Sequence, residues 1–286
     1  MEVSVICTLK SEEFSVKGLI DSLFSQHRMP DEFVIVDGGS ADHTVEIINL
    51  YIQSGLPINL IIKEGVNIAE GRNIAIKNAK HDYIASIDAG CRADKDWLKN
   101  LLRPFEEDPS LDVVAGFFLP DAESRYEEVV GELLYPKLEY MNPERFLPSG
   151  RSIVFKKKCW EEVGGYPEWL YTGEDSLFDL KLKESGYKFA FAKDAVVYWR
   201  PRPTLNKLFK QYFLYAKGTT QAGTTHIVAE AYGENIAKYI IPLTLKYSLL
   251  LLKKGQIVHL FYVPIILLIV FSAKLFGIIA GKVRSC

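Results

Sequence analysis

The stretch YIASIDAG, residues 83–90, runs from an apolar segment into Asp88 and ends on a glycine. A short apolar run indicates a buried β-strand, and an aspartate followed by a glycine is typical of the turn after it. Earlier in the chain, FVIVDGGS at residues 33–40 has the same arrangement around Asp37. Both stretches therefore predict a strand that carries an aspartate at its carboxyl end.

The rest of the first half alternates similar runs with segments of helical periodicity. Strands are predicted at Val3–Leu9, Phe33–Val36, Ile58–Lys63, Tyr83–Ile87 and Asp112–Leu119, and helices at residues 13–26, 41–54, 67–79 and 95–107. Alternation of this kind favours an α/β fold with a mainly parallel sheet covered by helices on both faces. In such sheets, ligands bind beyond the carboxyl ends of the strands.

After residue 120 the rhythm changes. A helix is predicted at residues 123–140 and another from Glu174, with a strand at Ser152–Phe155 and extended runs at Lys188–Ala192 and Ala195–Trp199. No linker-like composition separates the halves, so these elements are expected to extend the same sheet. Residues 204–217 mix aromatic and lysine side chains at helical spacing, which fits either a helix at a membrane interface or one packed on its own domain.

The C-terminal region is apolar and points to a membrane. Residues 257–280 are long enough to cross a bilayer as a helix, and residues 239–252 form a second apolar stretch that fits a span or a tilted interfacial helix. Two spans with a cytoplasmic main domain would leave Lys253 and Lys254 outside, against the positive-inside tendency. We therefore expect a main domain at residues 1–220 and a membrane-associated region at residues 221–286.

Composition and charge limit the expected partners and cellular compartment of the protein. The formal charge of −2 gives no basic surface for nucleic acid, which is excluded as an expected partner. The four cysteines lack CxxC spacing, which fits a reducing compartment and offers no zinc site. Lys10, Glu12, Glu13 and Lys17 lie around the first apolar run, so no signal peptide is expected. The main domain is therefore expected on the cytoplasmic side of the cell membrane.

Three groups of carboxylates are candidates for chemistry: Asp37, Asp88, and the Glu174–Asp175 pair in YTGEDSLFDLKL. Each also has a purely structural interpretation. Asp37 and Asp88 are suited to begin the turns that follow them, and Glu174 and Asp175 would be favoured by the helix dipole at a helix N-terminus. The functional interpretation is favoured by the order of these carboxylates along the chain.

Four segments resemble family 2 glycosyltransferases, which have the Rossmann-like GT-A fold. They are VSVICTLKSEE, VDGGSADHT, GVNIAEGRNIAIKNAKHDYIASIDAG and WEEVGGYPEWLYTGED. The resemblance extends from Val3 to about Gly218 and includes the family's opening strand, its second-strand signature, its DXD position and its ED motif. It implies a sugar transferred from a nucleotide-sugar donor with inversion at the anomeric carbon.

The resemblance also implies roles for the nucleotide-binding residues. Thr8 and Asp37 would contact the base, with Asp37 accepting a hydrogen bond from a ring N–H such as that of uracil, which favours a UDP-sugar. Arg72 would lie near the base and diphosphate, and Asp88 near the ribose and phosphates.

For catalysis, the resemblance implies Asp175 as the base that deprotonates the acceptor hydroxyl, with Glu174 beside it. Such a base contributes about 10²–10⁴-fold to the rate. A membrane-associated region would favour a lipid-linked or membrane-proximal glycan acceptor.

The chain departs from the family where Gly90 replaces the second aspartate of the DXD motif. That carboxylate usually ligates a divalent cation, Mg²⁺ or Mn²⁺, so Asp88 is left as the one candidate metal ligand and the cation is in question. Arg200 and Arg202 in VVYWRPRP are candidates to replace part of its charge, or to face lipid headgroups.

Two other functions remain open. A nucleotidyltransferase on a similar sheet would carry a basic glycine-rich loop after its first strand, and Thr8–Glu13 lacks one. A degenerate, non-catalytic membrane-bound binding or scaffold protein would fit the loss of the second aspartate. The intact Glu174–Asp175 pair argues against that reading.

Overall fold

The computed structural model describes residues 1–143, 146–227 and 262–283. The chain forms two compact units. Residues 1–118 and 147–199 make up the first, here called the sheet unit, and residues 119–146 and 200–286 belong to the second, the helical unit.

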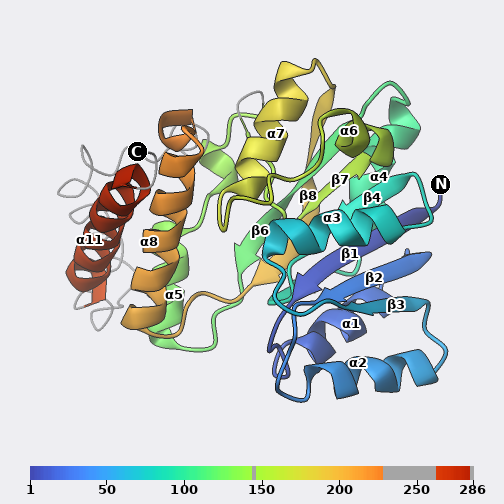
Figure 1. The fold of residues 1–286 in the computed structure, drawn as a ribbon, viewed down its shortest axis with the longest axis horizontal. Helices are drawn as coiled ribbons and strands as arrows, with labels where there is room; N and C mark the ends of the chain where they lie inside the picture. Colours follow the sequence, from blue (N-terminus) through green and yellow to red (C-terminus); the bar gives the residue numbers. More distant parts are fainter. Residues whose placement is uncertain (144–145, 228–261, 284–286) are drawn as a thin grey trace. The chain divides into compact units, whose positions relative to one another are not determined.

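One eight-stranded sheet organises the sheet unit, with strand order β3-β2-β1-β4-β7-β6-β8-β5 (Figure 1). The strands are β1 (Val3–Leu9), β2 (Glu32–Asp37), β3 (Ile58–Ile62), β4 (Tyr83–Ser86), β5 (Cys91–Ala93), β6 (Val113–Pro120), β7 (Ile153–Lys156) and β8 (Phe189–Trp199). Strands β1 to β4 are parallel, as predicted. The sheet as a whole is mixed, because β7 pairs antiparallel with β4 and β6, and β5 pairs antiparallel with β8.

The helices of the sheet unit are α1 (Val16–Phe24), α2 (Thr44–Gln53), α3 (Ile68–Asn78), α4 (Trp97–Glu107), α6 (Lys157–Glu162) and α7 (Glu174–Glu184). The start of α3 is fixed by a capping box, in which the Asn67 side chain accepts from the Glu70 N–H and Glu70 accepts from the Asn67 N–H. Helix α3 packs on β1 and β2. A capped helix seated on two central strands gives its side chains a fixed position at the sheet.

Several sequence predictions differ in detail from the structure. The two extended runs around residue 193 form one continuous strand, β8, and the short strand β5 was not predicted. The helix predicted at 123–140 is α5 (Arg125–Leu134) followed by a single 3-10 turn, η1 (Leu138–Tyr140). Pro136 explains the break, because the residue before a proline is driven out of helical geometry and Tyr135 is extended.

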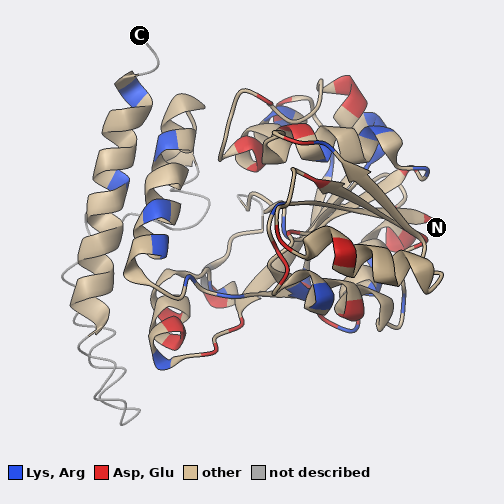
Figure 2. Ribbon diagram, turned by 60° about the horizontal axis from the view of Figure 1, so that its bottom comes forward, with Lys and Arg blue, Asp and Glu red and all other residues tan. Residues whose placement is uncertain are grey.

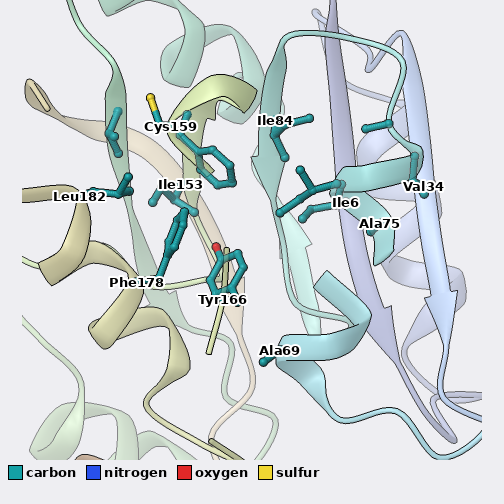
Figure 3. Packing of buried hydrophobic residues seen from close by; sticks show 14 of the residues in the cluster. Ile6, Val34, Ala69, Ala75, Ile84, Ile153, Cys159, Tyr166, Phe178 and Leu182 are labelled. Atoms are coloured by element: carbon teal, nitrogen blue, oxygen red, sulfur yellow. The ribbon is translucent and has the colours of Figure 1, made fainter. Parts of the chain in front are cut away.

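A buried apolar cluster joins α3 and α7 to the same part of the sheet (Figure 3). Ile6 and Ile84 come from β1 and β4, and Phe178 comes from α7. The Tyr166 ring stacks on Phe178, with 4.2 Å between centroids. Burial of each such large side chain contributes about 1.5–3 kcal/mol. The cluster therefore holds the N-terminal ends of α3 and α7 in fixed positions.

The helical unit contains α5, α8 (Leu205–Gln221) and α11 (Tyr262–Val283). Leu208 and Tyr212 of α8 pack with Val263 and Ile266 of α11, so the predicted amphipathic helix packs within its own unit. A Cβ built on Gly277 of α11 would lie 2.4 Å from the Phe213 carbonyl oxygen. Small residues therefore allow the two helices to approach closely.

Helix α11 covers most of the apolar stretch predicted at 257–280, and the stretch at 239–252 lies outside the described residues. Within the described part, α11 is the one helix long and apolar enough to cross a membrane. Helices α8 and α11 together carry five lysines and no acidic residue, as Figure 2 shows by colour.

Candidate active site

Three of the sequence-predicted residues lie at the carboxyl ends of neighbouring parallel strands. Thr8 is near the end of β1, Asp37 ends β2, and Asp88 follows β4 by two residues. The register places Leu9 beside Asp37 and Ile6 beside Ser86, so these ends meet at one edge of the sheet. This is the edge at which α/β sheets bind ligands.

Arg72 of α3 ties two of the predicted carboxylates together. Its Nη2 contacts Asp88 Oδ1 at 2.8 Å, and its Nη1 contacts Glu174 Oε1 at 2.6 Å. The guanidinium is almost fully buried and lies over the Tyr166 ring. Burial alone lowers the pKa of Arg72, but Asp88 and Glu174 outweigh it and hold that pKa above its ordinary value. Arg72 therefore remains a cation and holds both carboxylates.

Glu174 and Asp175 open α7, directly after Gly173, whose φ of 80° favours glycine. Glu174 is buried, and burial raises its pKa from 4.5 to about 7, with Asp175 adding to the rise and Arg72 opposing it. Asp175 is half-buried, and its Oδ2 accepts a hydrogen bond of 3.2 Å from the Gly150 N–H. The two neighbouring carboxyls thus differ in environment, with Glu174 enclosed and Asp175 reaching solvent.

Gly150, in the loop before β7, lies close to Arg72. A Cβ at this position would lie 2.2 Å from Arg72 Nη2. The Gly150 carbonyl accepts a hydrogen bond of 2.8 Å from Ser86 Oγ on β4. The loop is therefore fixed between the sheet and Asp175.

Arg151 lies next to Asp88, and the sequence did not predict it as a site residue. Its Nε is 3.5 Å from Asp88 Oδ2, and its Nη1 donates to Ser149 Oγ at 2.6 Å. The guanidinium carbon is 3.9 Å from the centre of the Trp199 ring and 5.2 Å from that of Phe118. A lone arginine in an irregular segment gives no sequence signal for such a position.

The structure gives Asp37 a role in its own loop. The side chain is fully buried, its Oδ1 accepts from the Gly39 and Ser40 N–H groups at 2.9 and 2.8 Å, and its Oδ2 accepts from Ser40 Oγ. Contact with a base would require this carboxylate to exchange those partners. Thr8 differs, because its Oγ1 is buried and has no hydrogen-bond partner among the described residues.

Arg200 and Arg202 belong to the helical unit. Arg200 forms ion pairs with Glu123 at 2.6 Å and with the buried Glu127 at 2.8 Å. Arg202 Nε donates to Gln211 Oε1 at 3.1 Å. The sheet-unit site gathers Arg72, Asp88, Glu174 and Asp175.

The residues present do not fit a divalent cation. Among the described residues, no group of three or more His, Cys, Asp or Glu side chains is arranged to hold a metal. Gly90 supplies no ligand, and both oxygens of Asp88 face arginines. A positive guanidinium beside each oxygen disfavours a further cation there.

Asp179 is a further buried carboxyl, one turn beyond Asp175 on α7. Neither of its oxygens has a hydrogen-bond partner among the described residues. Burial raises the pKa of Asp179 well above its ordinary value, and the charge of Asp175 adds to the rise. A neutral side chain is expected there, because an ionised carboxylate without partners is costly to bury.

Family models match most of the chain. The model described as glycosyl transferase family 2 matches residues 4–157, and that of glycosyl transferase family group 2 matches residues 83–280. One similar curated protein is the O-antigen chain rhamnosyltransferase RfbN of Salmonella typhimurium, 26% identical over 208 residues. The match covers 68% of this chain and 65% of RfbN, so it spans slightly less than two thirds of that relative.

Two solved structures show the same fold. The mannosyltransferase PcManGT from Pyrobaculum calidifontis, in complex with GDP-Man and Mn²⁺, aligns with a TM-score of 0.66 and 19% identity, over 96% of this chain and 87% of PcManGT. Residues 1–349 of S. aureus TarS, in complex with UDP-GlcNAc, align with a TM-score of 0.60 and 18% identity, over 100% of this chain and 92% of that 1–349 fragment. These alignments confirm the predicted GT-A fold. Because the family 2 model matches more than half of the sequence, the chain belongs to glycosyl transferase family 2.

Proposed function

We propose that this protein transfers a sugar from a nucleotide-sugar donor to a hydroxyl of a lipid-linked or membrane-proximal glycan acceptor, with inversion at the anomeric carbon. The observation that carries the proposal is the Arg72 bridge, which joins Asp88 at the donor edge of the sheet to Glu174 at the start of α7. Because Asp175 is adjacent to Glu174, a carboxylate that reaches solvent lies beside the expected donor position.

The chemistry at Asp175 is a single displacement. The acceptor hydroxyl gives its proton to the Asp175 carboxylate while its oxygen bonds to the anomeric carbon. The bond between that carbon and the diphosphate breaks, and a nucleoside diphosphate leaves. The Gly150 N–H bond orients Asp175 for this step. A base in this role must approach the hydroxyl to within about 2.6–3.2 Å.

The donor is proposed to be a UDP-sugar, bound along the ends of β1, β2 and β4. The unpartnered Thr8 Oγ1 supports a polar contact at this edge. The neighbour complexes hold GDP-Man in one case and UDP-GlcNAc in the other, so both bases belong in a donor screen.

The helical unit is proposed to attach the protein to the cytoplasmic face of the cell membrane. Seven large apolar side chains of α11 are exposed: Ile265, Leu268, Phe271, Leu275, Phe276, Ile279 and Val283. The lysines of α8 and α11, without acidic residues, complement anionic headgroups (Figure 2). Membrane attachment would concentrate a lipid-linked acceptor near the site.

A screen for nucleotide release tests the proposal. Purified full-length protein is incubated with UDP-, GDP- and dTDP-sugars and membrane lipid extract, and the product's anomeric configuration is read by NMR. We expect nucleotide release from one donor and a product whose anomeric configuration is opposite to that of the donor. A product that retains the donor configuration contradicts the mechanism, and no release from any donor favours the non-catalytic binding protein.

A further inference from the structure

We propose that Arg151 binds the diphosphate of the donor and supplies the positive charge that a divalent cation would otherwise provide. The inference rests on the proposed function and assigns a ligand to a residue outside the family motifs. Its basis is the arrangement of Arg151, Asp88, Trp199 and Gly90 at one corner of the sheet unit.

Two aromatic rings contact the guanidinium of Arg151. Its guanidinium carbon is 3.9 Å from the centre of the Trp199 ring, and the Phe118 ring lies 5.2 Å away. Phe118 and Trp199 pack edge to face, with 6.0 Å between centroids. An arginine stacked on aromatic faces is attracted to them by cation–π interactions of about 0.5–2 kcal/mol. The rings therefore help to orient the cation, whose Nη1 also donates to Ser149 Oγ at 2.6 Å.

The position that lacks the second carboxylate opens onto the same ring. A Cβ built on Gly90 would lie 3.9 Å from Cδ1 and Nε1 of Trp199. Two aspartates with a divalent cation would together be neutral, and Asp88 with Arg151 is also neutral. Arg151 thus supplies a positive charge beside Asp88, and Arg72 adds a second one at the same carboxylate.

Arg72, Arg151 and Arg200, three of the four arginines near or predicted for the site, differ in what holds them. Arg72 is 3% exposed, with ion-pair contacts of 2.6 and 2.8 Å, so it is fixed as a structural bridge. Arg200 is paired with two glutamates of the helical unit. Arg151 is 14% exposed, and its contact with Asp88 is longer, at 3.5 Å. Arg151 is thus more exposed than Arg72 and lies farther from the carboxylate beside it.

The chemistry of the ligand fits this side chain. A diphosphate presents several anionic oxygens, and a planar guanidinium donates to two of them in parallel. Lysine lacks the paired geometry, so Arg151→Lys should recover only part of the affinity. The charge that builds up on the leaving diphosphate during transfer would meet the same cation.

The test measures nucleotide binding in excess EDTA with purified full-length protein. UDP, GDP and dTDP, and the corresponding monophosphates, are titrated by calorimetry into wild type, Arg151→Gln and Arg151→Lys. Arg92→Gln is the matched control, because Arg92 also stacks on an aromatic ring, with its guanidinium carbon 4.4 Å from the centre of the Tyr198 ring, but is exposed on β5. Circular dichroism checks that each variant is folded.

Wild type is expected to bind one nucleoside diphosphate in EDTA. Arg151→Gln should weaken that binding about 10–100-fold, the range expected for charge-assisted hydrogen bonds, and leave monophosphate binding within about threefold. Arg92→Gln should behave as wild type. Equal diphosphate affinity in wild type and Arg151→Gln, or wild-type binding that needs Mn²⁺ or Mg²⁺, overturns the role of Arg151 and leaves the proposed function standing. A wild type that binds none of the three diphosphates, with or without metal, overturns the proposed function as well.

Discussion

Arg72 on α3 donates a 2.6 Å hydrogen bond to Glu174, which lies 102 residues further along the chain at the start of α7. The same guanidinium holds Asp88 after β4. Two helices and one strand end are therefore joined through a single buried cation. The relationship fixes the distance between the expected donor edge and the residue next to the proposed base.

Replacement of Arg72 by glutamine should destabilise the fold strongly. Removal of one partner from a buried ion pair leaves an uncompensated charge and costs about 3–5 kcal/mol. The free energy of unfolding, measured by denaturant titration, should fall by that amount. Arg103→Gln is the control, because its pair with Glu107 is exposed and should contribute less than about 1 kcal/mol. Similar losses in both variants would contradict the bridging role of Arg72.

The pH dependence of stability should report the buried Glu174. Its pKa in the folded state is raised from 4.5 to about 7, so the folded protein retains a proton that the unfolded chain loses between these values. The stabilisation is fully present below pH 4.5 and is lost as pH rises through 7. At about 1.4 kcal/mol per pKa unit, the loss is on the order of 3 kcal/mol.

Glu174→Gln isolates this effect, because glutamine does not titrate. Between pH 4.5 and pH 7.5, the unfolding free energy of the wild type should therefore fall relative to that of the variant. A difference that stays constant over this range would show that Glu174 titrates normally.

Gly150→Ala should disturb the site from the side of the loop. The added Cβ would lie 2.2 Å from Arg72 Nη2. Arg72 can move away only by breaking or stretching its ion pairs with Asp88 and Glu174. Overpacking of this kind costs about 1–3 kcal/mol. Gly90→Ala is the comparison, since its Cβ would be 3.9 Å from Trp199, and its unfolding free energy should stay within about 0.5 kcal/mol of wild type. Equal thermal stability of the two variants would contradict the close packing at Gly150.

Leu268→Asp should weaken membrane attachment. Leu268 is 66% exposed on α11, and an aspartate within a membrane helix costs about 2.5–3.5 kcal/mol. The fraction of protein that sediments with anionic vesicles should fall markedly. Ile62→Asp is matched to it, because Ile62 is 59% exposed at the end of β3, and that variant should sediment as wild type does. Loss of sedimentation in both would point to aggregation instead of attachment.

Much of the fold was predictable because its signals are local. The strands at Val3–Leu9 and Tyr83–Ile87 follow from short apolar runs, and both are present with bounds shifted by at most one residue. The three-residue strand β5 was missed because it is too short to show periodicity. The antiparallel β7 was predicted as a strand, but its direction depends on where the chain returns to the sheet, which no local pattern specifies.

The candidate site likewise contains residues that the sequence predicts and residues that only the folded structure brings together. Asp88 and Asp175 stand out because one follows a strand and the other lies at the start of a helix, each with a glycine two residues away. Arg151 depends on rings from β6 and β8 that approach it only in the folded chain. The burial of Asp37 in its own loop is likewise a tertiary fact, since the sequence DGGS is equally suited to a turn and to a ligand contact.

The most direct measurement is the turnover of Asp175→Asn with the donor that the screen identifies, beside Asp82→Asn. Asp82 is exposed at the opposite end of β4 from Asp88, so its substitution makes the same chemical change outside the site. Loss of the general base should lower kcat for Asp175→Asn by about 10²–10⁴-fold, with nucleoside diphosphate affinity unchanged and Asp82→Asn equal to wild type. A kcat for Asp175→Asn within about threefold of wild type would contradict the assignment of Asp175 as the base.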